Sequence, residues 1–280
     1  MSLAPNSTRK KVRVRVFKFC GILSIVDMLK TRIIPTLLWK DFGLVKGIGF
    51  DSWRRVGTVL PAIKVYNTRE VDELILVDIT ATNEDREPDY ESVEEFCAEC
   101  FVPITVGGGI RSLDHITKLL RAGADKICIN SAAYTNPSLV REAASRFGSQ
   151  CIVASIDVRR MENGTHVCFS RAGTRQEVKN PVEWAIELET MGAGEILLTS
   201  IERDGTMQGY DLNVIKEVSQ AVNIPLIASG GAGSYSHMVE AINAGATALA
   251  AASIFHFTQQ TPLEAKNHME NMGVPTRYHG

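Results

Sequence analysis

The chain has 280 residues, of which 45% are hydrophobic and 22% are charged, and its formal net charge is −2 at pH 7. This globular composition excludes intrinsic disorder, and without a run of 18 apolar residues we expect no membrane span. The near-neutral charge argues against a general nucleic-acid-binding protein. A chain of this length suits one α/β barrel or two ordinary domains.

Residues 1–27 differ from the rest, because they carry six Lys and Arg residues and a single acid, Asp27. Lys18 interrupts the apolar stretch that follows the first basic residues, and no Ala-x-Ala cleavage motif comes after it, so a signal peptide is not favoured. Met28 offers a later start. We therefore expect a disordered or mis-assigned basic extension over 1–27 and a barrel domain over 28–280.

From Arg32 onward, short apolar runs alternate with segments whose apolar residues recur every three or four positions. This alternation predicts strands that are each followed by an amphipathic helix, and hence a parallel sheet. The predicted strands are 32–38, 73–79, 104–106, 126–130, 151–156, 195–199, 226–228 and 248–252. The predicted helices include 113–121, 138–146, 182–191, 212–222 and 238–244. Eight strand–helix units in about 250 residues are typical of a TIM barrel.

The two halves of the chain also repeat one another. Residues 103–109 correspond to residues 225–231, and residues 122–124 correspond to residues 244–246. An open doubly wound sheet would not require this symmetry. The sequence therefore predicts an α/β fold with a single TIM (β/α)8 barrel built from two repeated half-barrels.

Glycine-rich turns follow the third and seventh predicted strands. Glycines let backbone amides approach an anion closely, and a following helix adds the positive end of its dipole. Because a TIM barrel holds its site at the C-terminal strand ends, we predict two equivalent cradles for a ligand with two phosphates. The loop after the sixth strand contacts this substrate or forms an ordinary turn. The predicted binding residues are Gly108, Gly109, Asn130, Ser131, Asp204, Gly205, Gly230, Gly231, Ala252 and Ser253.

Asp157 comes at the end of the fifth predicted strand, which is otherwise apolar. A carboxylate delivered into the barrel mouth in this way is a candidate general acid or base. The alternative is an ordinary salt bridge with Arg159 or Arg160.

Charged residues begin four of the predicted strands, at the opposite face of the barrel: Arg32, Glu73, Lys126 and Glu195. Two acids and two bases at this level can form a ring that closes the barrel floor. Taken alone, such a ring is typical of a structural ion-pair network.

Six cysteines are scattered along the chain, several of them in apolar runs. Cys97-x-x-Cys100 has no second cysteine pair and no histidine at ligand spacing, which favours helix packing over a metal or redox site. We expect reduced cysteines in a cytoplasmic protein, with no metal and no cofactor.

Together these motifs make residues 28–280 similar to the HisF family, the cyclase subunit of imidazole glycerol phosphate synthase. The segments that carry the resemblance are 32–35, 78–81, 106–111, 124–133, 147–150, 192–200, 228–233 and 251–257. The resemblance implies a heterodimer with a HisH-like glutaminase, whose ammonia crosses the barrel to a bisphosphorylated nucleotide. The implied products are imidazole glycerol phosphate, for histidine, and aminoimidazole carboxamide ribonucleotide.

The same resemblance implies roles for residues at the barrel floor. Arg32, Glu73, Lys126 and Glu195 match the ammonia gate of the family, while Asp125 and Gln150 match positions near the face that docks the glutaminase.

One catalytic position departs from the family pattern. The family uses an aspartate from strand 1 and another from strand 5 as acid and base; Asp157 matches the second, but Leu38 occupies the place of the first. Leucine cannot transfer a proton, and Asp41 is expected in the loop beyond the strand. The resemblance therefore favours a diverged ammonia-channelling paralogue that serves acetamidino-sugar formation for surface polysaccharides. The alternatives are a true cyclase of the lyase class that tolerates Leu38, and a non-catalytic scaffold for a glutaminase.

Overall fold

The structure is a computed structural model that describes residues 30–41 and 43–277, so the predicted extension over 1–27 lies outside the described residues. The strands are β1 (Arg32–Lys40), β2 (Gly43–Ile48), β3 (Asp51–Gly57), β4 (Leu74–Asp78), β5 (Ile104–Gly107), β6 (Lys126–Ile129), β7 (Ile152–Arg160), β8 (His166–Ser170), β9 (Arg175–Gln176), β10 (Glu195–Ser200), β11 (Leu226–Ser229) and β12 (Ala248–Ala251). The helices are α1 (Val59–Asn67), α2 (Tyr90–Ala98), α3 (Leu113–Arg121), α4 (Ser131–Thr135), α5 (Ser138–Phe147), α6 (Pro181–Thr190), α7 (Leu212–Ser219), α8 (Tyr235–Asn243), α9 (Ser253–Phe257) and α10 (Pro262–Asn271).

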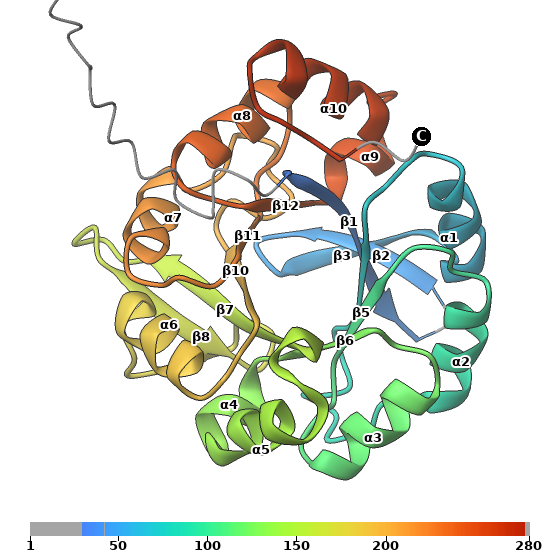
Figure 1. Ribbon diagram of the computed structural model, residues 1–280, viewed down its shortest axis with the longest axis vertical. Helices are drawn as coiled ribbons and strands as arrows, with labels where there is room; N and C mark the ends of the chain where they lie inside the picture. Colours follow the sequence, from blue (N-terminus) through green and yellow to red (C-terminus); the bar gives the residue numbers. More distant parts are fainter. Residues whose placement is uncertain (1–29, 42, 278–280) are drawn as a thin grey trace, which may run out of the picture.

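Eight of the strands close into a parallel barrel. Around the ring the order is β1, β4, β5, β6, β7, β10, β11 and β12, and β12 pairs again with β1. Helices surround this ring on the outside (Figure 1). The prediction of a single TIM barrel of the α/β class is confirmed.

The internal repeat is visible in the helix caps. Ser112 is the N-cap of α3, and its hydroxyl accepts a hydrogen bond from the backbone amide of His115. Ser234 is the N-cap of α8, and its hydroxyl accepts in the same way from the backbone amide of His237. Equivalent Ser–x–x–His caps therefore follow the third and the seventh strand of the barrel, as the repeat predicts.

Successive residues of each barrel strand face opposite sides, which produces two apolar layers. In β1, Ile33 packs in the outer layer between strands and helices, whereas Ile34 belongs to a separate inner cluster. The inner cluster fills the barrel between its floor and its mouth, and it contains Ile34, Ile75, Cys128, Val153, Leu197, Ile227, Ala248 and Ala250. Residues that follow this inner face toward the C-terminal ends therefore point into the mouth.

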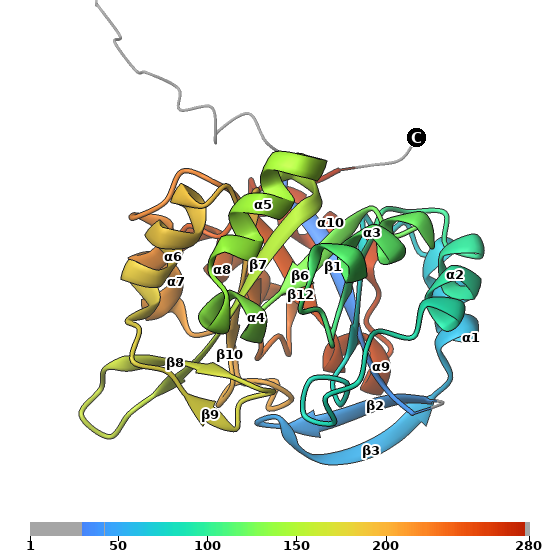
Figure 2. The same cartoon turned by 90° about the horizontal axis from the view of Figure 1, so that it is seen from below.

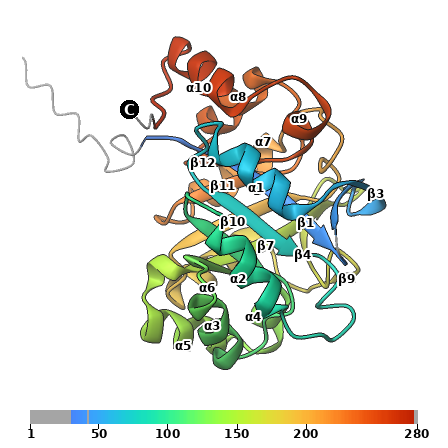
Figure 3. The ribbon, with the colours of Figure 1, turned by 90° about the vertical axis from the view of Figure 1, so that its right-hand side faces the viewer.

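Two additions at the C-terminal end of the barrel were not predicted. β7 continues to Arg160, beyond the predicted end at Ile156, because its last four residues pair with β8 in an antiparallel ladder. The β2–β3 hairpin follows β1, and the Arg54 guanidinium lies 4.0 Å from the centroid of the Phe257 ring in α9. Figures 2 and 3 show β3 and β9 at the same end of the barrel. The mouth is thus covered by extra chain, while the opposite end stays uncovered by strands among the described residues.

A buried ion pair fastens α10 to the barrel. The Lys266 ammonium donates to Asp72 Oδ1 at 2.9 Å, and both side chains are fully buried. The other oxygen of Asp72 accepts from the backbone amide of Ile33 at 2.7 Å.

The described residues contain no helix that is both long and apolar enough to cross a bilayer. Five cysteines lie in the described part of the chain, and all five are free thiols. Burial raises the pKa of Cys97 to about 12, so its thiol is protonated at neutral pH.

Candidate active site

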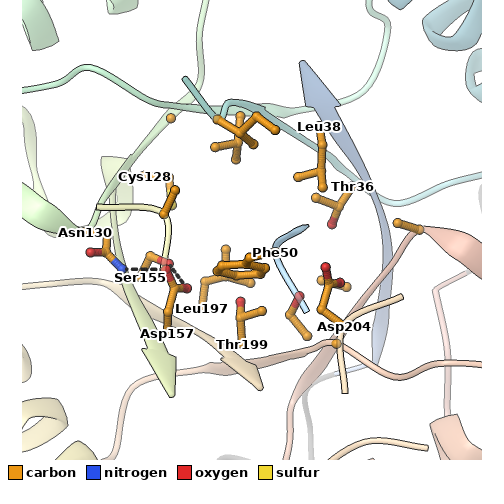
Figure 4. A pocket seen from close by; sticks show the side chains of 18 of the residues that line it. Thr36, Leu38, Phe50, Cys128, Asn130, Ser155, Asp157, Leu197, Thr199 and Asp204 are labelled. Atoms are coloured by element: carbon orange, nitrogen blue, oxygen red, sulfur yellow. Dashed lines mark hydrogen bonds between the residues drawn. The ribbon is translucent and has the colours of Figure 1, made fainter. Parts of the chain in front are cut away.

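One cavity opens at the C-terminal ends of the barrel strands, and every residue predicted to bind phosphate or substrate lines it. These residues come from the loops after β5, β6, β10, β11 and β12: Gly108, Gly109, Asn130, Ser131, Asp204, Gly205, Gly230, Gly231, Ala252 and Ser253. Asp157 and Leu38 line the same cavity. Figure 4 shows Leu38 and Asp157 on different sides of it. The structure therefore brings together residues that lie more than 200 positions apart in the chain.

Only glycine fits the two turns that form the predicted cradles. Gly108 has φ +106° and Gly231 has φ +107°, a region that side chains rarely adopt. A Cβ on Gly108 would lie 2.2 Å from the carbonyl oxygen of Asp78, and one on Gly231 would lie 2.1 Å from that of Gly209. Glycine at both turns therefore lets the backbone pack closely against the Asp78 and Gly209 carbonyls at the edge of the cavity.

The serines predicted beside these turns begin two short helices. Ser131 is the first residue of α4 and Ser253 is the first residue of α9. The Ser131 hydroxyl accepts a hydrogen bond from the backbone amide of Arg171 at 2.9 Å, which fixes the β8–β9 turn against the first cradle. Ser253 is buried beside the second cradle.

Asp157 lies inside β7 and not after its end, yet its side chain still faces the cavity. Asn130 Nδ2 donates to Asp157 Oδ2 at 3.0 Å, and the Ser155 hydroxyl donates to Oδ1 at 3.4 Å. Among the described residues Asp157 forms no salt bridge with Arg159 or Arg160, and the Arg159 guanidinium lies over the Phe169 ring. Burial raises the pKa of Asp157 to about 7; the Ser155 hydrogen bond opposes this rise and the charge of Asp204 adds to it.

Leu38 presents an apolar side chain to the cavity from β1. Strand alternation points Thr36 and Leu38 inward, while Leu37 and Trp39 pack outside against the helices. Asp41 follows the strand at φ +51° and lines a different groove, formed with residues of α1 and α2. As expected, Asp41 therefore offers no carboxylate to the cavity in place of Leu38.

Lys46 is a cavity residue that the sequence analysis missed. It lies on β2 with an exposed fraction of 4%, and its ammonium donates to the carbonyl oxygen of Thr36 at 3.3 Å. Burial lowers the pKa of Lys46 to about 8, and the negative charge of Asp204 limits this fall. The hairpin was not predicted, so no sequence signal placed this lysine in the mouth.

Asp78 also lines the cavity and was missed, but its carboxylate is fully engaged. Oδ1 accepts from the backbone amides of Thr80 and Ala81, both at 3.0 Å. Oδ2 accepts from the Arg86 guanidinium at 3.2 Å. Asp78 therefore shapes the β4–α2 loop beside the first cradle.

The four charged residues predicted for the barrel floor form a closed ring. Arg32 Nη1 lies 2.8 Å from Glu73 Oε1 and 3.1 Å from Glu195 Oε1. Lys126 Nζ lies 2.8 Å from Glu73 Oε2 and 2.9 Å from Glu195 Oε1. Burial alone would raise the pKa of Glu73, but Arg32 and Lys126 together lower it below its ordinary value. The ring is neutral and mutually hydrogen-bonded, and the inner apolar cluster separates it from the cavity.

The two residues predicted near a docking face lie at the floor end of the barrel. Asp125 immediately precedes β6, and its Oδ2 accepts from the backbone amide of Ile104 at 2.8 Å. Gln150 is exposed in the short turn before β7. Phe101 lies at the same end, in the loop before β5, three residues from Ile104, with 81% of its surface exposed. A lone aromatic residue between a helix and a strand is a weak signal in sequence, because such residues are more often buried.

Comparisons with known proteins agree with this architecture. The histidine biosynthesis protein family matches residues 32–261. A protein of Campylobacter jejuni subsp. jejuni serotype O:2, provisionally named imidazole glycerol phosphate synthase subunit hisF2, is 48% identical over 250 residues. That alignment covers 89% of this chain and 99% of the relative. The chain therefore belongs to the histidine biosynthesis protein family and is a HisF-like member of it.

Proposed function

We propose that this chain is a HisF-type synthase subunit that accepts ammonia from a HisH-like glutaminase and delivers it to a bisphosphorylated ligand in the mouth cavity. The acceptor chemistry has diverged from imidazole formation, and it serves acetamidino-sugar synthesis for surface polysaccharides in the cytoplasm. The observation that carries the divergence is Leu38, an apolar side chain within the cavity where the family places a carboxylate.

The two glycine turns support a ligand with two phosphates. They face one cavity from β5 and β11, on the two halves of the repeat. Both turns consist of glycines that line the cavity, so no side chain there would keep an anion from the backbone. A ligand held at both ends would lie across the mouth and present its middle to Asp157.

Features of the barrel floor favour the proposed ammonia route and a glutaminase partner. The ring of Arg32, Glu73, Lys126 and Glu195 lies at the end opposite the cavity, so ammonia entering there would pass the inner apolar cluster. Exposed Phe101, in the loop that precedes β5 at the floor end, offers an apolar anchor for a partner. The Campylobacter relative is itself named as a synthase subunit, which agrees with a second chain.

A true imidazole glycerol phosphate synthase cyclase is the second candidate, and Asp157 favours it. Its pKa of about 7 is suited to proton transfer at neutral pH, and both glycine turns line the cavity. This candidate requires the cavity to perform the cyclisation without a carboxylate at position 38.

One assay separates the two candidates. Purified protein is given the phosphoribulosyl-formimino aminoimidazole carboxamide nucleotide and excess ammonium salt at about pH 8.5, where free ammonia replaces the glutaminase. If the function has diverged, the unaltered chain is expected to bind the nucleotide without producing imidazole glycerol phosphate. Leu38→Asp is expected to produce that compound, because loss of a general acid or base lowers the rate of a reaction by about 10²–10⁴-fold. Rapid turnover by the unaltered chain would instead establish the cyclase. Failure to bind the nucleotide at all would contradict both.

A further inference from the structure

The mouth cavity contains a half-buried carboxylate, Asp204, to which the proposed function gives no proton-transfer role. Asp204 lies in the loop after β10 and lines the cavity together with Leu38 and Asp157. In Figure 4 its side chain points toward Thr36 and Leu38, whereas Asp157 lies across the cavity beside Asn130 and Ser155. The two carboxylates therefore face the cavity from different sides.

Backbone packing holds Asp204 in this place. The amide of Gly49, in the β2–β3 turn, donates to the Asp204 carbonyl oxygen at 3.0 Å. The next residue, Gly205, packs so tightly that a Cβ would lie 2.1 Å from the Gly47 carbonyl oxygen. The loop is thus clamped against the hairpin that carries Lys46.

Lys46 is a buried cation close to the position that lacks a catalytic carboxylate. Its hydrogen bond to the Thr36 carbonyl places the ammonium beside β1, two residues before Leu38, and Lys46 lines the cavity. The Thr36 hydroxyl is buried and has no hydrogen-bond partner among the described residues. Lys46 and Asp204 line the same cavity, and the Asp204 loop is hydrogen-bonded to the hairpin that carries Lys46. The negative charge of Asp204 accordingly limits the fall in the Lys46 pKa.

Other titratable groups that line the cavity are less suited to move a proton. Asp78 is saturated by two backbone amides and Arg86. Burial raises the pKa of the Cys128 thiol to about 12, which keeps it protonated.

Asp204 differs from these groups. Burial raises the pKa of Asp204, and the Lys46 charge and the Gly205 amide oppose this rise.

We propose that Asp204, held beside Lys46, is the second proton-transfer group of the cavity and replaces the carboxylate that Leu38 lacks, working opposite Asp157. This inference rests on the proposed function, in which ammonia attacks an acceptor bound in the cavity. With a carbonyl acceptor, a C–N bond forms and the π electron pair of the C=O bond moves to oxygen. Asp204 takes one proton from the attacking nitrogen, and neutral Asp157 gives one proton to the oxygen, which leaves a carbinolamine.

The first test needs no substrate. The carboxyl groups of aspartate-labelled full-length protein are titrated by ¹³C NMR in the unaltered chain, Asp204→Asn and Lys46→Met. Removal of the Asp204 charge is expected to lower the Asp157 pKa by about half a unit or more, and Lys46→Met to raise the Asp204 pKa. An Asp157 titration that is identical in Asp204→Asn and the unaltered chain would show that the two carboxylates do not act on one site, and would overturn the pairing.

The second test uses ammonium salt and the same bisphosphorylated nucleotide, whose ketone serves as the carbonyl acceptor, and mass spectrometry follows the ammonia-dependent formation of the carbinolamine or its dehydrated imine. Imidazole glycerol phosphate is not the readout, because the proposed function expects none from the unaltered chain. Asp204→Asn is expected to lose at least about 10²-fold in rate, but less than about 10-fold when Leu38→Asp is also present, because the carboxylate introduced on β1 then supplies the missing group. Asp114→Asn, an exposed change on α3, is the control.

Calorimetric measurement of nucleotide binding distinguishes failure of the proposed function from failure of the role proposed for Asp204. No binding contradicts the proposed function. Binding of the nucleotide with equal rates of adduct formation for Asp204→Asn and the unaltered chain, including no adduct from either, contradicts the role of Asp204. An equal loss in both the Leu38 and Leu38→Asp backgrounds would assign Asp204 to ligand binding and would also refute the replacement.

Discussion

The charged ring at the barrel floor allows a stability prediction that can be worked from its distances. Lys126→Met removes the ammonium that lies 2.8 Å from Glu73 and 2.9 Å from Glu195. Loss of one partner from a buried ion pair costs about 3–5 kcal/mol, because the remaining charge stays buried without compensation. Arg32 still bonds both glutamates, at 2.8 and 3.1 Å, so we expect the lower end, about 3 kcal/mol.

The effect should be partly reversed by removing a negative charge as well. In Lys126→Met/Glu195→Gln, the ring keeps the neutral Arg32–Glu73 pair, so the double variant is expected to lose about 1–2 kcal/mol less than the sum of the single variants. The free energy of unfolding is measured by urea denaturation at pH 7. Lys64→Met is the control, since Lys64 and Glu99 form an exposed pair that should contribute less than about 1 kcal/mol.

The stability that the charged ring contributes should fall at low pH. Glu73 has a lowered pKa in the folded state, so its contribution is present above its unfolded value of about 4.3 and is lost as pH falls through the folded value. The gap between the unaltered chain and Lys126→Met should therefore narrow below about pH 4. A Lys126→Met variant within about 0.5 kcal/mol of the unaltered chain at pH 7 would refute a tightly coupled buried ring.

Three further predictions concern the cavity and the partner. Asp157→Asn should stabilise the fold at pH 8 by up to about 4 kcal/mol and hardly at all near pH 4. The reason is that burial raises the pKa of Asp157 to about 7, so the fold loses stability as pH rises from the unfolded pKa of this carboxyl to its folded pKa. Urea midpoints at the two pH values check this. Gly231→Ala should lower the thermal midpoint and weaken nucleotide binding at least about 10-fold by calorimetry, whereas Gly57→Ala, where a Cβ meets nothing within 4 Å, should do neither. Phe101→Asp should weaken binding of a HisH-like glutaminase by at least about 10-fold in a titration and leave ammonium-dependent turnover unchanged; unchanged affinity would place the partner elsewhere.

The local pattern of the chain was sufficient to predict the barrel. Alternation of apolar runs with helical periodicity depends on neighbouring residues alone, so all eight barrel strands were located to within a few residues. The glycine turns were equally readable, because a positive φ and a close backbone approach demand glycine wherever the chain folds. Because parallel strands all run in the same direction, residues at strand starts were predicted at the floor and residues at strand ends were predicted at the cavity.

The residues that the sequence did not reveal depend on contacts between distant segments. Lys46 lies on a hairpin that no local pattern marked, and only the packing of that hairpin over the mouth buries its ammonium beside Asp204. The Asp157 strand continues past its predicted end because β8 pairs with it, which no local pattern encodes. Burial and electrostatic coupling are properties of the assembled cavity, so the raised pKa of Asp157 and the neighbours that could compensate for Leu38 emerge only once the barrel has closed.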